Sequence, residues 1–320
     1  MQGDFRWMAA AASVAARGRP LSSPNPAVGA LIVRDGRLVS RGWTQVGGRP
    51  HAEAMALEAA GEQARGATLY VTLEPCAHQS DRGPACADLV AEAKLARVVV
   101  GCEDPDPRTA CRGIARLRDA GIACETIDSE AARQSLAGYL IRAAKARPYT
   151  TLKIACSLDG CIATGSGESQ WITGELARAH GHAVRAQSDA ILVGGETLRA
   201  DSPRLDVRLP GLEGRSPKRV VLTRGEAPEG WTALASPEDS DALAPAQYLL
   251  IEGGAGAAAA FLAADRVDRM LIYRAPIVIG GGRPMIGDIG LASLDAAHGR
   301  WRLDHARALG SDRLEVYSRT

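Results

Sequence analysis

The sequence HAEAM at residues 51–55 and the sequence EPCAHQSDRGPAC at residues 74–86 decide how the first half of the chain folds. His51 and Glu53 stand where an alanine-rich helix is predicted to begin. Taken alone, His51 is either a surface residue or a metal ligand. Glu53 is either an acid that suits the positive end of the helix dipole or a proton carrier. The cysteines that follow decide between these alternatives.

Two cysteines supply the remaining donors of a metal site. Cys76 follows Pro75 at the end of a predicted strand, and Cys86 opens a predicted helix whose free N–H groups favour a thiolate. One histidine nitrogen and two thiolates suit zinc, and three ligands leave a fourth position open for water. We therefore predict that His51, Cys76 and Cys86 bind one zinc ion per chain, with Glu53 as the proton carrier beside it.

The spacing of the cysteines separates this chain from the best-known zinc deaminases. The pattern H-x-E…P-C-x-x-C of zinc nucleobase deaminases matches at HAE and PC, but nine residues instead of two lie between Cys76 and Cys86. His78 falls inside this longer segment, and three roles are open for it: a substitute ligand, a substrate contact or a loop residue. We prefer Cys86 to His78 as the ligand.

The long form PCAHQSDRGPAC, together with NPAVGALIV at residues 25–33, resembles the deaminase domain of the bifunctional riboflavin-biosynthesis deaminase–reductases. The resemblance implies a cytidine-deaminase-like α/β/α domain that replaces an exocyclic amine of a diaminopyrimidinone ribosyl phosphate by oxygen. It also implies that Asn25 helps to hold the pyrimidine. The alternatives are a nucleobase or tRNA deaminase with a non-catalytic C-terminal domain, which the long spacing disfavours, and a zinc-stabilised structural protein, in which Glu53 has no purpose.

Composition limits the classes of protein that remain. The 320 residues suggest about two domains, and 46% hydrophobic and 23% charged residues are ordinary for a globular protein. A net charge of +1 argues against nucleic acid as a partner, and no apolar run is long enough for a membrane span. Seven cysteines without a secretory signal predict a reducing cytoplasm. We expect Cys102, Cys111 and Cys124 to be small buried side chains, and His180 and His182 to lie on a helix surface.

Strands and helices alternate along both halves, which predicts an α/β protein with largely parallel strands. Asp35-Gly36 between two apolar runs predicts a hairpin, and one helix is expected near residues 129–146. Arg147-Pro148 is the predicted boundary between residues 1–147, a zinc-dependent deaminase domain, and residues 148–320, a reductase domain. In the second half we expect a strand and loop at residues 190–197, a loop insertion at residues 225–246 and closing antiparallel strands.

The second half carries a weak dinucleotide signal. G-x-G-x-x-A at residues 254–259 follows a predicted strand and suits a pyrophosphate. Position 272 is Ile272, however, so the acid that a Rossmann domain requires is absent. The segments at residues 152–163, 166–173, 185–208, 250–262 and 267–281 instead resemble the dihydrofolate-reductase-like α/β domain of the same riboflavin-biosynthesis enzymes.

This resemblance implies that NADPH reduces the ribosyl group of the deaminated product to a ribityl group. It implies NADPH contacts at Ala155, Trp171, Thr197, Asp201, Gly254, Ala255, Gly256, Ala257, Ala258, Ala259 and Ala260. It implies substrate contacts at Ser169, Arg185, Leu205, Arg208 and Glu252. The two arginines suit a clamp on the substrate phosphate, and Lys153 on the opening strand is a further candidate. The resemblance also implies a homodimer through the reductase half, while Thr223 and Arg224 leave the preference for NADPH over NADH open.

Overall fold

The structure is a computed structural model that describes residues 2–78 and 82–320. It divides into two compact units, Met1–Ala146 and Arg147–Thr320, which we describe separately. The division lies next to the Arg147-Pro148 position at which the sequence places the domain boundary. No helix among the described residues has the length and hydrophobicity that crossing a bilayer requires.

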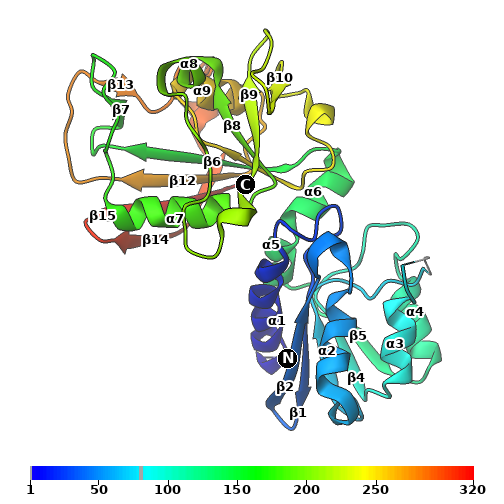
Figure 1. Cartoon of the computed structure of the whole chain (residues 1–320). Helices are drawn as coiled ribbons and strands as arrows, with labels where there is room; N and C mark the ends of the chain where they lie inside the picture. The colour runs from blue at the N-terminus through cyan, green and yellow to red at the C-terminus, as the bar shows by residue number, and fades with distance from the viewer. Residues whose placement is uncertain (1, 79–81) are drawn as a thin grey trace. The chain divides into compact units, whose positions relative to one another are not determined.

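The first unit is built on a five-stranded sheet with the order β2-β1-β3-β4-β5 (Figure 1). β1 is antiparallel to both of its neighbours, whereas β3, β4 and β5 are parallel. The strands are β1 (Gly29–Arg34), β2 (Arg37–Trp43), β3 (Thr68–Val71), β4 (Arg97–Val100) and β5 (Ala123–Thr126). The helices are α1 (Gln2–Ala15), α2 (Ala52–Ala60), α3 (Cys86–Glu92), α4 (Arg112–Asp119), α5 (Glu130–Ser135) and α6 (Ala137–Lys145).

The predicted hairpin joins β1 to β2. Asp35 and Gly36 both have positive φ, 51° and 70°, as a two-residue type I′ turn requires. Arg34 pairs with Arg37 across the turn. The hairpin prediction is therefore confirmed.

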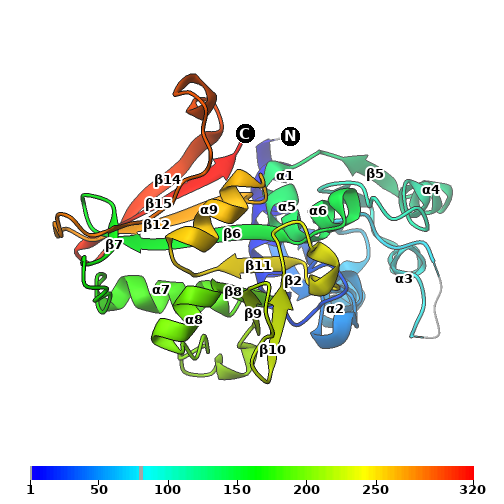
Figure 2. The same ribbon diagram turned by 90° about the horizontal axis from the view of Figure 1, so that it is seen from above.

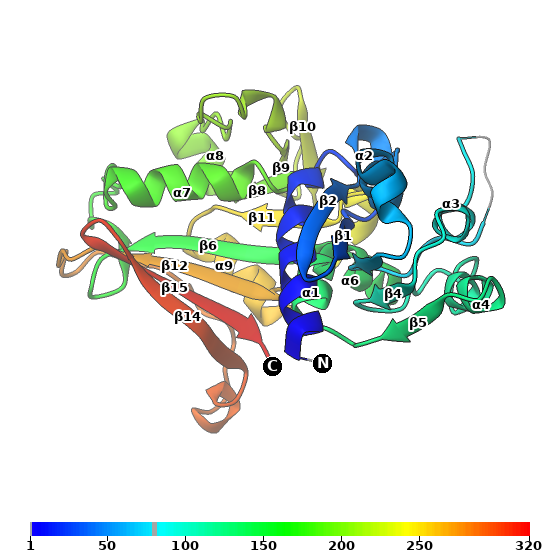
Figure 3. The same ribbon diagram turned by 90° about the horizontal axis from the view of Figure 1, so that it is seen from below.

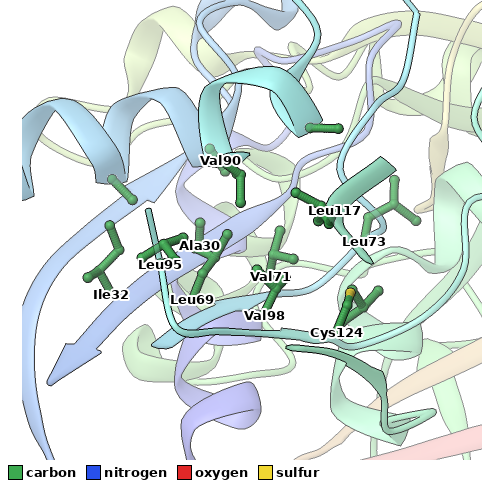
Figure 4. Close-up of a cluster of buried hydrophobic side chains, with 14 of the residues drawn as sticks. Ala30, Ile32, Leu69, Val71, Leu73, Val90, Leu95, Val98, Leu117 and Cys124 are labelled. Atoms are coloured by element: carbon green, nitrogen blue, oxygen red, sulfur yellow. The ribbon is translucent and has the colours of Figure 1, made fainter. Parts of the chain in front are cut away.

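Alternate residues of the strands face two helical layers, which makes the first unit an α/β/α sandwich. Leu69, Val71 and Val98 belong to a buried cluster that also contains residues of α2, α3 and α4. Figure 4 shows these three side chains gathered near Val90 of α3. Tyr70 and its neighbours on the opposite face pack against residues of α1 and α5. The predicted α/β/α domain is confirmed, and the zinc-ligand segments lie between the sheet and the α2–α3 layer.

The second unit contains an eight-stranded sheet with the order β10-β9-β8-β11-β6-β12-β15-β14. Neighbours from β10 to β12 are parallel, and β12, β15 and β14 are antiparallel, as predicted. Its strands are β6 (Tyr149–Cys156), β8 (Ala190–Gly194), β9 (Lys218–Leu222), β10 (Trp231–Leu234), β11 (Tyr248–Ile251), β12 (Arg269–Arg274), β14 (Trp301–Leu309) and β15 (Asp312–Arg319). A separate pair is formed by β7 (Cys161–Ala163) and β13 (Arg283–Pro284).

Helices cover both faces of this sheet. α9 (Ala255–Ala263) packs on one face through Ala257, Ala258 and Phe261, and α7 (Glu175–Arg185) packs on the other through Ala177. Figure 2 shows α9 and α7 on opposite sides of β6. β14 forms the edge of the sheet beyond β15 (Figure 3). The carboxyl ends of β6, β8 and β11 lie side by side in this sheet, which is where ligands bind in open α/β sheets.

Four details of the prediction were wrong. The expected loop after β8 is helix α8 (Gly195–Asp201), because Gly194 supplies an extended start and residues 195–201 are compatible with a helix. The expected loop insertion at residues 225–246 contains β10, which pairs with β9, and a short 3₁₀ helix, Ser240–Leu243. The helix near residues 129–146 is two helices separated at Leu136, which is buried. Cys111 is exposed at the start of α4, not buried.

The first residue of the second unit is fixed by a buried ion pair. Arg147 Nη1 and Nη2 donate to Asp268 Oδ2 and Oδ1 at 2.6 and 2.7 Å. The same carboxylate accepts the backbone N–H of Thr150 at 2.8 Å. Arg147 and Asp268 are 5% and 9% exposed, so water screens this pair little. The pair ties the start of β6 to the residue before β12.

Candidate active sites

The three predicted zinc ligands come from three different segments of the first unit. His51 immediately precedes α2, Cys86 is the first residue of α3, and Cys76 lies in the segment that follows β3. His51 Nδ1 lies 3.2 Å from Cys86 Sγ and 3.6 Å from Cys76 Sγ. Their ligand atoms all lie within 4.8 Å of one another, and no other group of histidine, cysteine and acidic side chains converges in this way among residues 2–78 and 82–320.

Two backbone contacts hold Cys76 against the start of α3. The N–H of Cys86 donates to Cys76 Sγ at 3.3 Å, and the N–H of Ala87 donates to the carbonyl oxygen of Cys76 at 3.1 Å. These N–H groups belong to the first turn of a helix, where they have no partner within the helix itself. The start of α3 therefore supplies the sulfur of Cys86 and holds the sulfur of Cys76 next to it. The two sulfur atoms are close in space although nine residues lie between them in the sequence.

The two thiols differ in acidity. Hydrogen bonding from the Cys86 thiol, together with His51 and the Cys86 N–H, lowers the pKa of Cys76 against the effect of burial. The hydrogen bond to Cys76 and burial raise the pKa of Cys86. Burial by itself lowers the pKa of His51, but the hydrogen bond with Cys76 and the charge of Glu53 raise it overall. The lowered pKa of Cys76 favours its thiolate even without a metal. One nitrogen and two sulfur donors fit a zinc ion with an open fourth position.

Glu53 lies in the first turn of α2 and is 3% exposed. Burial raises its pKa to about 7, although the charge of His51 acts in the opposite direction. Glu53 lines the same cavity as His51 and Cys76. A buried carboxyl group with a pKa near neutrality accepts and returns a proton readily, which suits general acid–base catalysis.

The cavity next to these residues has a volume of about 280 Å³. Asn25 Nδ2 donates to the Gly48 carbonyl at 3.0 Å and lies 3.4 Å from His51 Nε2. A Cβ atom on Gly48, whose φ is +85°, would lie 2.5 Å from Asn25, so glycine is required for this approach.

His78 lies outside the ligand group, with Nδ1 3.4 Å from Thr109 Oγ1. The cavity is also lined by Pro24, Pro26, Val28, Thr44, Arg49, Leu73, Glu74, Arg82, Asp104, Asp106, Arg108 and Tyr139.

A second cavity, of about 360 Å³, lies in the second unit. Seven of the predicted NADPH contacts line it: Ala155, Trp171, Thr197, Asp201, Gly254, Ala255 and Gly256. Lys153, Ser169 and Glu252 line it too. Trp171 is 64% exposed, and the guanidinium carbon of Arg178 lies 4.9 Å from its ring centroid. The cavity thus joins the carboxyl ends of β6 and β11 to the starts of α8 and α9.

The glycine turn before α9 opens onto this cavity. The N–H of Gly254 donates to Thr197 Oγ1 at 3.1 Å. A Cβ atom on Gly253 would lie 3.0 Å from the backbone nitrogen of Gly194, so the turn packs closely on β8. The start of a nine-residue helix next to unobstructed backbone suits a phosphate. Residues 257–260 do not line the cavity, and Ala257, Ala258 and Ala259 are buried.

Glu252 sits between two cations. Arg185 binds it through both Nε and Nη2, at 2.7 and 2.9 Å, and Lys153 Nζ lies 3.5 Å from Oε2. Burial by itself raises the pKa of Glu252, but the charges of Lys153 and Arg185 lower it to about 2. The predicted phosphate clamp needs a free guanidinium, and Arg185 instead pairs with Glu252. Arg208 is the more exposed arginine, with Nε 3.6 Å from Asp206 Oδ1.

The residues around Arg185 form a small cavity of about 80 Å³. Lys153, Arg185, Arg208, Glu252 and Tyr273 are among the residues that line it. Because Lys153 and Glu252 also line the larger cavity, the two cavities share a wall of charged groups.

The expected role of Leu205 as a substrate contact and the expected surface position of His180 and His182 were incomplete. Leu205 is 5% exposed, belongs to a hydrophobic cluster with Ile191, and is not among the residues that line either cavity. His180 is half-buried, with Nδ1 2.6 Å from the hydroxyl oxygen of Tyr273. His182 Nδ1 accepts the backbone N–H of Arg208 at 3.3 Å. The two histidines therefore have partners inside the unit and are not simple surface residues.

Several residues that line the cavities were not predicted. In the first unit Asp104 and Tyr139 share a hydrogen bond of 2.6 Å at the cavity wall. A signal for Asp104 existed, because it follows β4 as Cys76 follows β3, and the carboxyl ends of parallel strands meet at one edge of a sheet. Arg178 and Tyr273 in the second unit carry no comparable local signal.

Comparison with known proteins supports a deaminase domain followed by a reductase domain. The family model described as the cytidine and deoxycytidylate deaminase zinc-binding region matches residues 1–102. The model described as the RibD C-terminal domain matches residues 148–234 and 243–314. The chain is 34% identical to the riboflavin biosynthesis protein RibD of Aquifex aeolicus, over 99% of this chain and 98% of that one. It is 38% identical to RibD of Escherichia coli, over 88% and 89%.

Solved structures of similar proteins cover both units of the chain. RibD of Acinetobacter baumannii, form 1, is 36% identical and superposes with a TM-score of 0.84, covering 100% of this chain and 99% of that one. A diaminohydroxyphosphoribosylaminopyrimidine deaminase/5-amino-6-(5-phosphoribosylamino)uracil reductase of Thermotoga maritima is 30% identical, with a TM-score of 0.86 and the same coverage.

A zinc-binding deaminase domain followed by a reductase domain defines a bifunctional deaminase–reductase. The relatives match over nearly the full length of both chains. The chain belongs to the RibD family of riboflavin-biosynthesis proteins.

Proposed function

We propose that the first unit deaminates a diaminopyrimidinone ribosyl phosphate and that the second unit reduces the ribosyl group of the product to a ribityl group with NADPH. The observation that carries this proposal is that the buried Glu53 lines one cavity with His51 and Cys76, and that the ligand atoms of these two residues converge with that of Cys86. A structural zinc site is closed by four ligands and needs no acid–base group. The arrangement therefore supports catalysis.

In the deaminase half, His51, Cys76 and Cys86 hold one zinc ion per chain, and this ion supplies Lewis-acid activation of water when bound. Glu53 would take one proton from the attacking water and deliver it to a ring nitrogen, and it would then carry the second proton, from the hydroxyl of the adduct, to the departing amine, which leaves as ammonia. Its pKa of about 7 in the metal-free site suits transfer in both directions. Asn25, next to His51, holds the polar edge of the pyrimidine.

In the reductase half, the larger cavity holds NADPH, which supplies the hydride. Thr197 and the start of α9 at Gly254, which are joined by a hydrogen bond, would hold its phosphates, and Ala155, Trp171 and Asp201 line the same cavity. Ala257–Ala260 follow the Gly253-Gly254 turn in α9 and stabilise it without lining the cavity.

The charged wall shared by the two cavities faces the substrate. Lys153 carries a proton-donating ammonium group beside Glu252, and Arg185 holds Glu252 in place. Arg208, exposed on the small cavity, is the better-placed cation for the substrate phosphate, and Ser169 lies on the wall of the larger cavity. Leu205 contributes packing beneath the site.

Residues 1–147 and 148–320 correspond to the two activities in this proposal. The alternative of a nucleobase or tRNA deaminase with a non-catalytic second domain is not favoured, because the RibD relatives match across both halves. All seven cysteines are unpaired, which supports a reducing compartment such as the cytoplasm. The exposed edge strand β14 offers backbone groups for pairing with a second copy, and sedimentation measurements test such a dimer.

The proposal is tested by supplying the diaminopyrimidinone ribosyl phosphate with zinc and NADPH. Ammonia release and the loss of NADPH absorbance are followed separately. Both signals are expected, and the second should depend on the first. NADH in place of NADPH tests the cofactor preference. Ammonia release without NADPH oxidation would restrict the proposal to the first unit.

A further inference from the structure

We propose that Arg49 is the cation that makes the deaminase cavity prefer a phosphorylated substrate over the corresponding nucleoside. This inference rests on the proposed deaminase function. Three arginines line the cavity, namely Arg49, Arg82 and Arg108. A phosphate ester in this cavity needs at least one guanidinium that is free to bind it.

Arg108 is already paired. Its Nε lies 3.0 Å from both oxygens of Asp106, and its Nη2 lies 2.6 Å from Oδ2. The backbone N–H of Arg108 donates to the same carboxylate at 2.9 Å. A phosphate would have to displace Asp106 from Arg108. The Arg108 side chain is also 68% exposed, and an ion pair at such an exposed position contributes little binding free energy.

Arg82 is also engaged. Its Nη2 donates to the carbonyl oxygen of Gly47 at 2.7 Å, which fixes one side of the guanidinium. The residue is exposed, so water competes for the rest of its hydrogen-bonding capacity.

Arg49 differs from both. It is half-buried, and it makes no hydrogen bond or ion pair with any residue that the structure describes. A Cβ atom on Gly83, whose φ is +136°, would lie 3.1 Å from Arg49 Nη1, so the glycine leaves room for the guanidinium. Arg49 precedes His51 by two residues, which places the cation on the same wall as the metal ligands.

The acidic residues of the cavity do not neutralise Arg49. Glu74 accepts the backbone N–H groups of Cys111 and Ile114, at 3.1 and 3.0 Å. Asp104 accepts the hydroxyl of Tyr139 at 2.6 Å, Asp106 binds Arg108, and Glu53 is buried beside His51. A half-buried guanidinium that has no partner among residues 2–78 and 82–320 is unfavourable by itself within that part of the chain, and an anionic ligand in the cavity removes that cost.

The test compares the phosphorylated substrate with its dephosphorylated nucleoside in the full-length, zinc-loaded enzyme. Arg49→Gln is expected to lower kcat/KM for the phosphorylated substrate about 10- to 100-fold, mainly through KM, because it removes a charge-assisted contact made in both ground and transition states. The value for the nucleoside should change less than about threefold. Arg49→Lys should restore part of the loss, since it keeps the charge but not the fork of donors.

Arg108→Gln is the matched control, and its effect on the phosphorylated substrate should be smaller than that of Arg49→Gln. Zinc content is measured for each variant. An equal loss on both substrates, or no loss on either, would overturn the inference and leave the deaminase function intact. A larger effect of Arg108→Gln would overturn it as well. Failure of the unaltered enzyme to release ammonia from either substrate would instead overturn the proposed function on which the inference rests.

Discussion

Glu53 is separated from solvent and stands two residues from a metal ligand, so its replacement tests the chemistry without disturbing the site. Glu53→Gln keeps the size and shape of the side chain but cannot carry a proton. We expect ammonia release to fall by about 10²- to 10⁴-fold, the usual contribution of a general acid–base group. The coupled release assay measures this rate. Zinc content should remain at one ion per chain, and release within tenfold of the unaltered enzyme would show that Glu53 is not the proton carrier.

Lys153 is the residue that tests the reductase half most directly. Its ammonium lies 3.5 Å from Glu252 and 5.6 Å from the centroid of the Tyr273 ring. Lys153→Met keeps an unbranched side chain one atom shorter and removes the charge, while Arg185 remains to neutralise Glu252. We expect the rate of NADPH oxidation with the deaminated substrate to fall by about 10²-fold or more. Deaminase activity of the same preparation serves as the control, and its loss would point to a general folding defect.

The sequence was sufficient to predict which three side chains converge in the first unit, and insufficient to predict how the charged groups of the second unit pair. His51, Cys76 and Cys86 carry side chains that are rarely brought together for any other purpose, and each begins or ends a predictable element. Arg49 and Tyr273 have no such signal, because an arginine before a proline and a tyrosine in a strand are common. Their positions follow from tertiary packing. The pairing of Arg185 with Glu252, 67 residues further along, is likewise visible only in the structure.

At the scale of elements, α1 is attached to the sheet by a nearly buried acid. Asp4 Oδ1 accepts hydrogen bonds from Arg97 Nη1 on β4 and from the hydroxyl of Tyr70 on β3, both at 2.8 Å. The hydrogen bond from Arg97 lowers the pKa of Asp4 from 3.8 to about 2, against the effect of burial. A carboxylate whose pKa is lower in the folded state stabilises the fold above its unfolded pKa and ceases to do so as the pH falls through the folded value.

Asp4→Asn is therefore expected to lower the free energy of unfolding at pH 7 by about 1–2 kcal/mol. The difference from the unaltered protein should shrink as the pH falls from 3.8 towards about 2. Urea unfolding at a series of pH values measures it. Asp35→Asn is the control, because the Asp35 side chain is 92% exposed and its contact with Arg34 is long, at 3.9 Å. A constant difference at all pH values would contradict the assignment.

The elements that were predicted correctly have strong local patterns, and the others depend on distant partners. The Asp35-Gly36 turn and the apolar strands β3 and β4 are specified by their own residues. β10 was missed because Trp231–Leu234 is short and mostly exposed, and it becomes a strand by pairing with β9. Helix α8 was missed because Gly194, which precedes it, and Gly195, its first residue, suggest a loop. Its first turn instead lies against the Gly253-Gly254 turn, a contact that the sequence does not reveal.

At the scale of the whole molecule, the buried hydrophobic clusters each draw their residues from one unit only. The three proposed zinc ligands all belong to the first unit. Removal of zinc by a chelator should therefore abolish ammonia release but leave NADPH oxidation of the deaminated substrate unchanged. Differential scanning calorimetry should show a lower transition temperature for one unit alone. A matching shift of the second transition would show that the two units are energetically coupled, and restoring zinc should reverse both losses.

The ion pair between Arg147 and Asp268 determines where the chain can be divided for separate expression of the two halves. The match to the RibD C-terminal domain begins at residue 148, so a fragment cut there would keep Asp268 and discard Arg147. Removing one partner of a buried ion pair typically costs about 3–5 kcal/mol, a large share of the stability of a small domain. A reductase fragment that starts at Arg147 or earlier avoids this loss, so a single residue at the terminus decides whether the buried carboxylate of Asp268 keeps its partner.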